Sequence, residues 1–502
     1  MKNFRKMLAL LLALAMVFSL AACGGNNKPA ETSKDQKPAE TGKEEKPAEA
    51  AKPGEDITLT YFLHGKGKDQ AQVEEKVNAR LAELNAGYKV KFIMNSWGEY
   101  EQKLPLAARG AGDYFDIATT ASWLGNYAGL ANEGSFLDIT ELAKEKAPKL
   151  YGTLSENQIK GATVNGKLYG IPTTVSGAPM ARDHFVWSIE ELANIGKTPE
   201  DVQKIRTVEE LEPLLKEWKE KYPDKYPLDG GSEWAVRRVD NLIKTKEDGS
   251  AVIENIFEAD YMKKALDTIK AYKDTKYIHQ EAGVENSTFK QEEPGTWLVK
   301  RAEGEPGANA LWSIGWKTPV VAVPTAEDIY ISNANVQGKL TSIYAHTKYP
   351  DQAMNFIELI ATDDVIQNLL AWGIEGTHYK LEDGRAIETP EKAEGWNTWQ
   401  AQFVTDAKRL PNKDQLKQDD PKFKEEVEKF NAEIKPAADL GFTPSPELVE
   451  QLGQIFKVKN DYYKDLNRGR NEKQNEFYEK LKAANIDDVL AKLQQEYDAW
   501  KK

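Results

Sequence analysis

Tryptophan is the residue type best placed to bind a small molecule in this chain, which holds twelve of them. A flat indole can cover the apolar C–H face of a sugar ring, while Asp, Asn, Glu and Arg side chains take the hydroxyls on its rim. If one ring removes on the order of 100 Å² of apolar surface from water, it contributes about 2 to 3 kcal/mol at roughly 25 cal/mol per Å². Two such rings would bring the affinity into the micromolar range after the costs of association.

The position of each tryptophan decides whether it is a candidate ligand platform. Trp97 and Trp123 follow strand-like segments, whereas Trp218 and Trp500 lie in amphipathic helices and are expected to pack in the core. Five more tryptophans stand near loops or proposed chain crossings: Trp187, Trp234, Trp312, Trp316 and Trp372. The polar candidates for binding hydroxyls are His64, Asn126, Arg182, Asp183 and Glu375. Core packing or a structural role is the alternative for each of them.

Patterns typical of catalysis or metal binding are missing from the sequence. The five histidines show no metal-ligand pairing, and no His-Glu-x-x-His or Gly-x-Ser-x-Gly motif occurs. A single cysteine, Cys23, excludes internal disulfides and a thiolate zinc cluster. We therefore expect no catalytic residues, metal or cofactor. The pair of facing carboxylates of a glycoside hydrolase can be neither found nor excluded among 80 acidic residues.

The charge balance argues against a nucleic-acid partner. Lys and Arg number 67 against 80 Asp and Glu, and the first 22 residues hold Lys2, Arg5 and Lys6 but no acid. Without that segment, 64 basic and 80 acidic side chains remain, a net charge of −16. A nucleic-acid binder would need a basic surface to replace the counterions of the phosphates.

The N-terminus has the pattern of an export signal. An apolar run of 16 residues, from Met7 to Ala22, follows the basic residues and is short for a membrane span of about 20 residues. The sequence Leu20-Ala21-Ala22-Cys23 resembles the lipobox of bacterial lipoproteins, which implies cleavage before Cys23 and lipid, such as palmitate, on that residue. The alternative is an ordinary secreted protein whose signal contains a cysteine. Residues 23–55 repeat Lys-Pro-Ala-Glu at 28, 37 and 46, a composition typical of a solvated tether.

Alternating strand and helix patterns begin after the tether. Residues 57–63 and 88–94 read as strands, Val73 to Leu84 and 99–109 as helices, and 115–119 as a third strand. This order predicts a parallel sheet, in which ligands meet the carboxyl ends of the strands. Those ends are at 63–65, 95–97 and 120–123.

The rest of the chain alternates in the same way. A capping box at Thr207 and Glu210 predicts a helix that ends before Pro223. Strands are expected at 320–324 and 340–346, a helix at 351–361, and mainly helices from Pro421 onward. The last helix should bury Val489, Leu490, Leu493, Tyr497 and Trp500.

Five segments in order resemble extracellular solute-binding proteins of family 1, closest to the LipO-like and LplA-like lipoproteins of Gram-positive bacteria. They are GATVNGKLYGIPT (161–173), TVEELEPLLKEWKEKYPDKYPL (207–228), YAHTKYPDQAMNFIELIATDD (344–364), WGIEGTHYKL (372–381) and LKAANIDDVLAKLQQEYDAWKK (481–502). The similarity covers residues 56–502. It implies an α/β fold of two lobes, periplasmic-binding-protein-like of type II, with a ligand cleft and hinge between them and a helical C-terminal segment.

The resemblance also implies the domain plan and the function. Lobe 1 is expected to comprise 56–173 and about 330–372, and lobe 2 about 174–329 and 373–502. The chain should cross between them near Thr173 to Met180, near Pro324 to Leu340 and after Gly373. The expected function is that of a monomeric, lipid-anchored binding protein on the extracellular face of the cell membrane, which delivers an oligosaccharide to the permease of an ABC importer. The alternatives are a secreted polysaccharide-active enzyme and a receptor for a peptide or another solute; no segment identifies a particular sugar.

Overall fold

The computed structural model describes residues 56–112, 114–173, 180–235, 241–282, 284, 291, 293–326, 329–399, 410–411 and 421–502. The predicted signal peptide, the lipidated Cys23 and the tether lie outside these residues, as does most of the first predicted crossing, 174–179. Within the described part of the chain, no helix combines the length and the apolar character needed to cross a bilayer.

The first sheet begins with the predicted parallel strands. β1 (Ile57–Lys66) pairs in parallel with β2 (Tyr88–Asn95) and with β3 (Ile117–Thr120). Helices α2 (Gln70–Glu83) and α3 (Trp97–Ala108) connect them, and α2 buries Val73, Val77 and Leu81 at helical spacing. The register places His64 opposite Asn95, so the carboxyl ends of β1 and β2 lie together.

Strands from much later in the chain complete this sheet. β13 (Leu340–Ile343) lies antiparallel between β3 and β6 (Gly170–Pro172), and β16 (Asn397–Trp399) pairs antiparallel with β1. The predicted assignment of 373–502 to lobe 2 is therefore corrected for 373–399. Trp396 is fully buried in the first core, and its Nε1 donates to the carbonyl of Leu370 at 3.0 Å.

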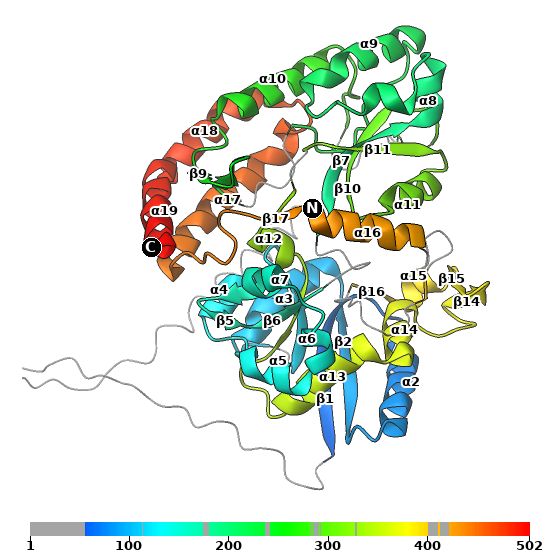
Figure 1. The fold of residues 1–502 in the computed structure, drawn as a ribbon, viewed down its shortest axis with the longest axis vertical. Coiled ribbons are helices and arrows are strands. Elements are labelled where there is room, and N and C mark those ends of the chain that lie inside the picture. The colour runs from blue at the N-terminus through cyan, green and yellow to red at the C-terminus, as the bar shows by residue number, and fades with distance from the viewer. Residues whose placement is uncertain are drawn as a thin grey trace, which may run out of the picture. The chain divides into compact units, whose positions relative to one another are not determined.

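Helices pack around the first sheet (Figure 1). α13 (Pro350–Thr362) follows β13 closely and contacts α5 (Thr140–Lys146) and α6 (Pro148–Tyr151), while α14 (Asp364–Trp372) contacts α2. The remaining elements of this part are α4 (Tyr127–Asn132), α7 (Glu156–Ala162), the hairpin β4 (Thr163–Val164) and β5 (Lys167–Leu168), α12 (Asn333–Val336), the hairpin β14 (Tyr379–Glu382) and β15 (Arg385–Glu388), and α15 (Lys392–Gly395).

A second sheet supports a separate hydrophobic core. β7 (Arg182–Ser188) lies between β10 (Val299–Gly304) and β11 (Val320–Pro324), antiparallel to both. Around it lie α8 (Ile189–Asn194), η1 (Pro199–Val202), η2 (Glu209–Leu211), α9 (Glu212–Lys221), the hairpin β8 (Ile243–Thr245) and β9 (Ala251–Ile253), α10 (Asp260–Asp274) and α11 (Ala308–Gly315). Trp218 is fully buried in this core, as expected.

The C-terminal segment is helical, as expected. It comprises α16 (Pro421–Glu433), the short strand β17 (Ile434–Pro436), α17 (Pro446–Leu466), η3 (Asn471–Lys473), α18 (Gln474–Ala483) and α19 (Ile486–Lys501). α19 buries Val489, Leu493 and Tyr497, but Trp500 in its last turn is 38% exposed. Its ring instead packs at the surface against the rings of Phe442 and Tyr497, with centroids 5.5 and 5.6 Å away.

Two short segments connect the two cores. β12 (Ile329–Ile331) pairs in parallel with β17, and the chain then continues to Leu440, which packs in the first core, and Phe442, which packs in the second. The side chain of Asn333 fixes this turn, accepting from the backbone N–H of Gly441 and donating to the carbonyl of Phe442, each at 2.7 Å. Both segments therefore link the lobes through paired backbone.

Candidate functional site

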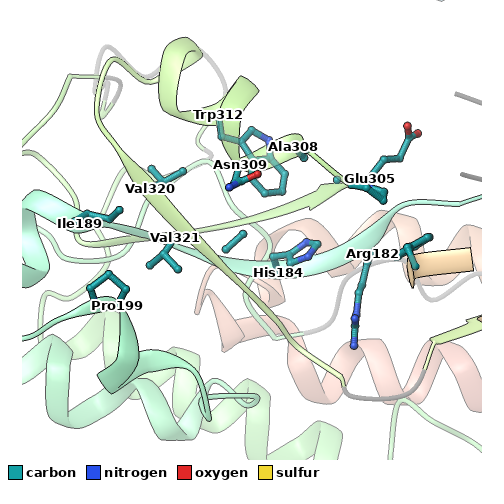
Figure 2. Close-up of a pocket in the computed structure, with 15 residues that line it drawn as sticks. Arg182, His184, Ile189, Pro199, Glu305, Ala308, Asn309, Trp312, Val320 and Val321 are labelled. Atoms are coloured by element: carbon teal, nitrogen blue, oxygen red, sulfur yellow. The ribbon is translucent and has the colours of Figure 1, made fainter. Parts of the chain in front are cut away.

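A cavity of about 380 Å³ lies beside the second sheet. Its walls come from β7, the end of β10 and the loop after it, α11, β11, Ile189, Pro199 and Phe430 of α16. Figure 2 shows Trp312 and Asn309 of α11 on one side of the cavity and His184 and Arg182 of β7 on another. The cavity therefore combines an indole ring with polar side chains.

Trp312 belongs to an aromatic stack. Its ring lies parallel to that of Trp316, with an interplanar angle of 2° and ring centroids 5.8 Å apart, and His184 meets it edge-on at 5.7 Å. Both indoles are partly exposed. An offset parallel pair of this kind presents a flat apolar surface, the geometry that covers the apolar face of a sugar.

Polar groups stand around that surface. Asn309 is exposed on α11, three residues before Trp312 and so on the same helix face. Arg182 lines the cavity from the start of β7, and its guanidinium lies 3.9 Å from the Glu433 carboxylate of α16. Glu305 adds an acceptor from the loop before α11. These are the groups that recognise hydroxyls.

The imidazole of His184, which lines the cavity, is neutral at physiological pH. Burial lowers its pKa from the ordinary value of 6.5 to about 4, outweighing the raising effect of the neighbouring Asp183 carboxylate. A neutral imidazole can serve as donor or acceptor to a hydroxyl without adding a buried charge.

The carboxyl ends of β1 and β2 hold a second group of predicted residues. His64 is only 4% exposed and stands edge-on to Tyr100, and burial lowers its pKa to about 4. Its neighbour Asn95 accepts a hydrogen bond from Lys103 Nζ at 3.0 Å. Trp97 is the first residue of α3, but its side chain lies outside what the structure describes.

Trp123, after β3, is the most exposed tryptophan whose side chain the structure describes, at 51%. Its Nε1 donates to the carbonyl of Gly338 at 2.8 Å, which holds one edge of the indole while half of its surface stays in solvent. An anchored, exposed indole is suited to stack on a ligand.

Three predicted tryptophan platforms are corrected by their burial. Trp187 and Trp234 are fully buried in the second core, and Trp372 is 5% exposed with its Nε1 bonded to the carbonyl of Leu410. Trp187 is buried because side chains alternate along β7, so that Phe185 and Trp187 face the second core while Val186 faces the opposite side. These three rings have no free face for a ligand in this structure.

The remaining predicted polar residues divide between structural contacts and a second cavity. Asn126 caps α4, accepting from the N–H of Gly129. Asp183 accepts from Arg301 at 2.7 and 2.8 Å and from Thr325 at 3.0 Å. Glu375 is exposed at a cavity of about 500 Å³ formed mainly by α14 and the loop after it.

Sequence reasoning missed Asn309, Glu305 and Phe430 of the first cavity. Asn309 could have been found from its spacing of three residues from Trp312 on one helix. Phe430 carries no such signal, because α16 comes more than a hundred residues later and only the folded chain brings it to the cavity.

No cluster of His, Cys, Asp and Glu suited to a metal occurs in the described parts of the chain. His378 and Asp69 form a close pair, with Nε2 and Oδ2 3.2 Å apart, but His378 is fully buried. The backbone N–H of Ile374 donates to its Nδ1, so the pair fastens the loop after α14 to the start of α2.

A match to a known protein family shows to which family the chain belongs. The model for bacterial extracellular solute-binding proteins matches residues 76–377. The chain belongs to this family. A domain of unknown function matches residues 439–502 of this solute-binding protein. The family match confirms the resemblance found in the sequence.

Relatives and solved structures extend this similarity. A carbohydrate ABC transporter substrate-binding protein of Streptococcus pneumoniae is 26% identical, covering 100% of this chain and 99% of the relative. The N-glycan transport solute-binding protein NgtS of the same species has a TM-score of 0.70 at 24% identity, covering 88% of this chain and 99% of NgtS. The alginate-binding protein AlgQ2 has a TM-score of 0.61 at 14% identity, covering 89% and 98%. This solute-binding protein thus has the two-lobe α/β fold.

The lowered pKa of His184 predicts an acid-sensitive stability. The unfolded chain, with the ordinary pKa of 6.5, takes up a proton before the folded one, so the folded state loses stability as pH falls from about 6.5 toward 4. His184→Gln should reduce the slope of melting temperature against pH between about pH 7 and pH 4.5, while His64, whose pKa burial also lowers to about 4, keeps its own contribution. Val321→Ala, on the same cavity wall, should shift the whole profile without changing its slope. Equal slopes for wild type and His184→Gln would contradict the assignment.

Proposed function

We propose that this solute-binding protein is the lipid-anchored receptor of a carbohydrate ABC importer. It binds an oligosaccharide reversibly between its two lobes and passes it, chemically unchanged, to a membrane permease. A separate ATPase supplies the energy of transport. Which sugar it binds is set by the polar groups around the aromatic surface.

The observation that carries this proposal is the parallel pair of Trp312 and Trp316 beside the 380 Å³ cavity. Its flat surface and its polar rim of Arg182, Glu305 and Asn309 match the two kinds of surface on a sugar ring. The relatives support the same ligand class, since one is a carbohydrate transporter component and NgtS has been solved in complex with Man5GlcNAc.

The second lobe surface would come from the strand ends of the first sheet. Trp123 offers an exposed indole there, and Trp97 follows β2 at the start of α3. The Nδ2 of Asn95 is buried and has no hydrogen-bond partner among the described residues, so it can donate to a ligand. A ligand that contacts both lobes favours the closed state, and shifting that equilibrium from 1:99 to 99:1 needs about 5.5 kcal/mol. Two stacked rings and a few hydrogen bonds are of this size.

The lipid anchor of the proposal rests on Cys23. Cleavage before this residue would leave a new N-terminus that carries several acyl chains, which hold a protein at a membrane durably. The Lys-Pro-Ala-Glu repeats would then keep the lobes away from the lipid. The protein would act as a monomer at the extracellular face.

A melting screen tests the ligand class. A bound oligosaccharide at 100 times its dissociation constant adds about 2.7 kcal/mol to the stability of the folded state, so the melting temperature should rise. The panel holds maltotriose, cellotriose, mannotriose, triacetylchitotriose and a set of short peptides, and each incubated sugar is then analysed by mass spectrometry. We expect a sugar to raise the melting temperature and to be recovered intact. A cleaved sugar would favour the enzyme, and a response to peptides alone would favour a peptide receptor.

Truncation of the exposed indoles tests the platform. Trp312→Ala and Trp123→Ala should each weaken binding of the stabilising oligosaccharide by at least about tenfold, because each removes one stacked ring. Isothermal titration calorimetry measures the affinity. Tyr261→Ala is the control, since Tyr261 is 45% exposed on α10 and should leave affinity unchanged. Unaltered affinity in both tryptophan variants would remove these rings from the site.

A further inference from the structure

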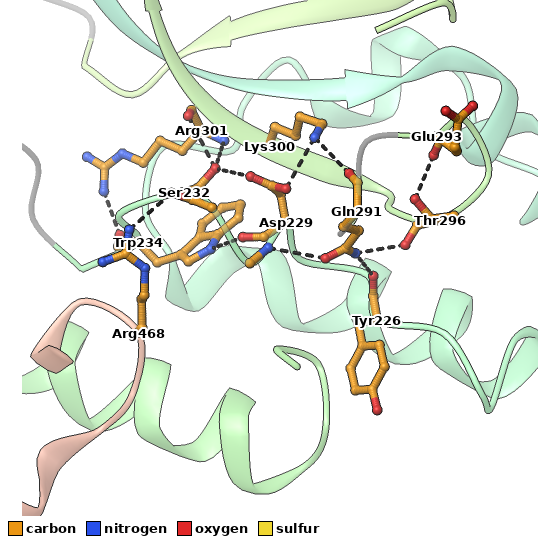
Figure 3. Close-up of polar contacts among 12 residues, drawn as sticks. Tyr226, Asp229, Ser232, Trp234, Gln291, Glu293, Thr296, Lys300, Arg301 and Arg468 are labelled. Carbon is orange, nitrogen blue, oxygen red and sulfur yellow. Dashed lines mark hydrogen bonds and ion pairs between the residues drawn. The ribbon is translucent and has the colours of Figure 1, made fainter. Parts of the chain in front are cut away.

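A lysine ammonium is enclosed beneath the second sheet. Lys300 of β10 has a side chain that is only 8% exposed, and its Nζ lies 3.2 Å from Asp229 Oδ1. It also donates to the carbonyl of Gln291 at 3.2 Å (Figure 3). Asp229 is fixed in turn, because its carboxylate accepts from Ser232 and its carbonyl accepts from Trp234 Nε1. The position of the ammonium is therefore well determined.

Aromatic rings make up another part of its surroundings. The Nζ of Lys300 lies 4.7 Å from the ring centroid of Trp297 and 5.3 Å from that of Trp316. The two rings meet edge to face, with an angle of 79° and centroids 5.7 Å apart. A cation over an indole face is attracted by the ring quadrupole, and the attraction grows when water is excluded, as it is here.

Trp316 also stacks on Trp312, the indole that lines the cavity. Trp312 lies parallel to Trp316 at 5.8 Å and faces the cavity. Trp316 follows the end of α11, and the next residue, Lys317, has a left-handed backbone with φ of 55°. The orientation of Trp316 therefore depends on its side-chain contacts as well as on the helix.

We propose that Lys300 is a positioning residue of the sugar-binding surface: its ammonium orients Trp316, which sets the plane of Trp312 at the cavity. This inference rests on the proposed function, since it assigns how that site is held. Lys300 touches no ligand and acts through the rings. The alternative is that Lys300 serves only to neutralise Asp229. In that case, removing the charges of both residues together would leave the rings of Trp316 and Trp312 in place.

The test removes the ammonium without leaving a buried lone carboxylate. The double variant Lys300→Met with Asp229→Asn keeps the side-chain size while removing both charges. Circular dichroism of the ligand-free protein measures the exciton band of the stacked indoles, and Trp316→Phe defines the signal when the pair is absent. Lys317→Met is the matched control, because Lys317 directly follows Trp316 in the sequence and its side chain is 70% exposed. Its Nζ lies 3.7 Å from a carboxylate oxygen of Glu293.

We expect the double variant to lose most of the exciton band and to bind the oligosaccharide identified by the melting screen about tenfold more weakly. Lys317→Met should keep both. An unchanged exciton band in the double variant would overturn the inference, as would unchanged affinity. If that double variant does not fold, Lys300→Gln combined with Asp229→Asn decides in the same way, because it also removes both charges and glutamine retains hydrogen bonding. Should no sugar bind wild type, the proposed function fails, while the exciton band still decides whether Lys300 orients the rings.

Discussion

The threading of one chain through two hydrophobic cores is the constraint on which the rest of this structure depends. The first sheet is incomplete until β13 inserts between β3 and β6 and β16 pairs with β1. The second core is closed by α17, α18 and α19 from the end of the chain. Since each core needs segments from both sides of the crossings, the connections are held at both ends. Such connections allow rotation of one lobe against the other while each core stays intact.

The binding surface proposed here solves a problem of desolvation. A sugar has hydroxyls that must exchange their bonds to water for bonds to protein, so its net gain comes largely from the apolar face that a ring covers. Trp312 and Trp123 retain accessible surface, whereas the polar residues around Trp312 come from two separate stretches of the chain, 182–184 and 305–309. A buried ammonium below Trp316 adds stiffness without presenting a charge to the ligand. Preorganised rings of this kind reduce the entropy lost on binding.

Local sequence patterns were sufficient to predict the helices and strands but not which distant segments they pair or pack with. The alternation in β1 and β2 and the helical spacing of Val73, Val77 and Leu81 predicted the parallel sheet, which the structure has. The run around Trp396 is too polar to predict a core strand, so the pairing of β16 with β1 was missed. Trp187 was misplaced because its burial comes from the second core, to which α9, α10 and α17 contribute from later in the chain. The stack of Trp312 on Trp316 was not predicted, although both rings were candidates, because helical spacing alone does not fix ring planes.

Small-angle X-ray scattering with and without the stabilising oligosaccharide tests most directly whether sugar is held between moving lobes. We expect a smaller radius of gyration in the presence of the sugar and a return to the starting value when the sugar is dialysed away. Saturating binding with no change in the radius of gyration would contradict closure of the lobes around the ligand.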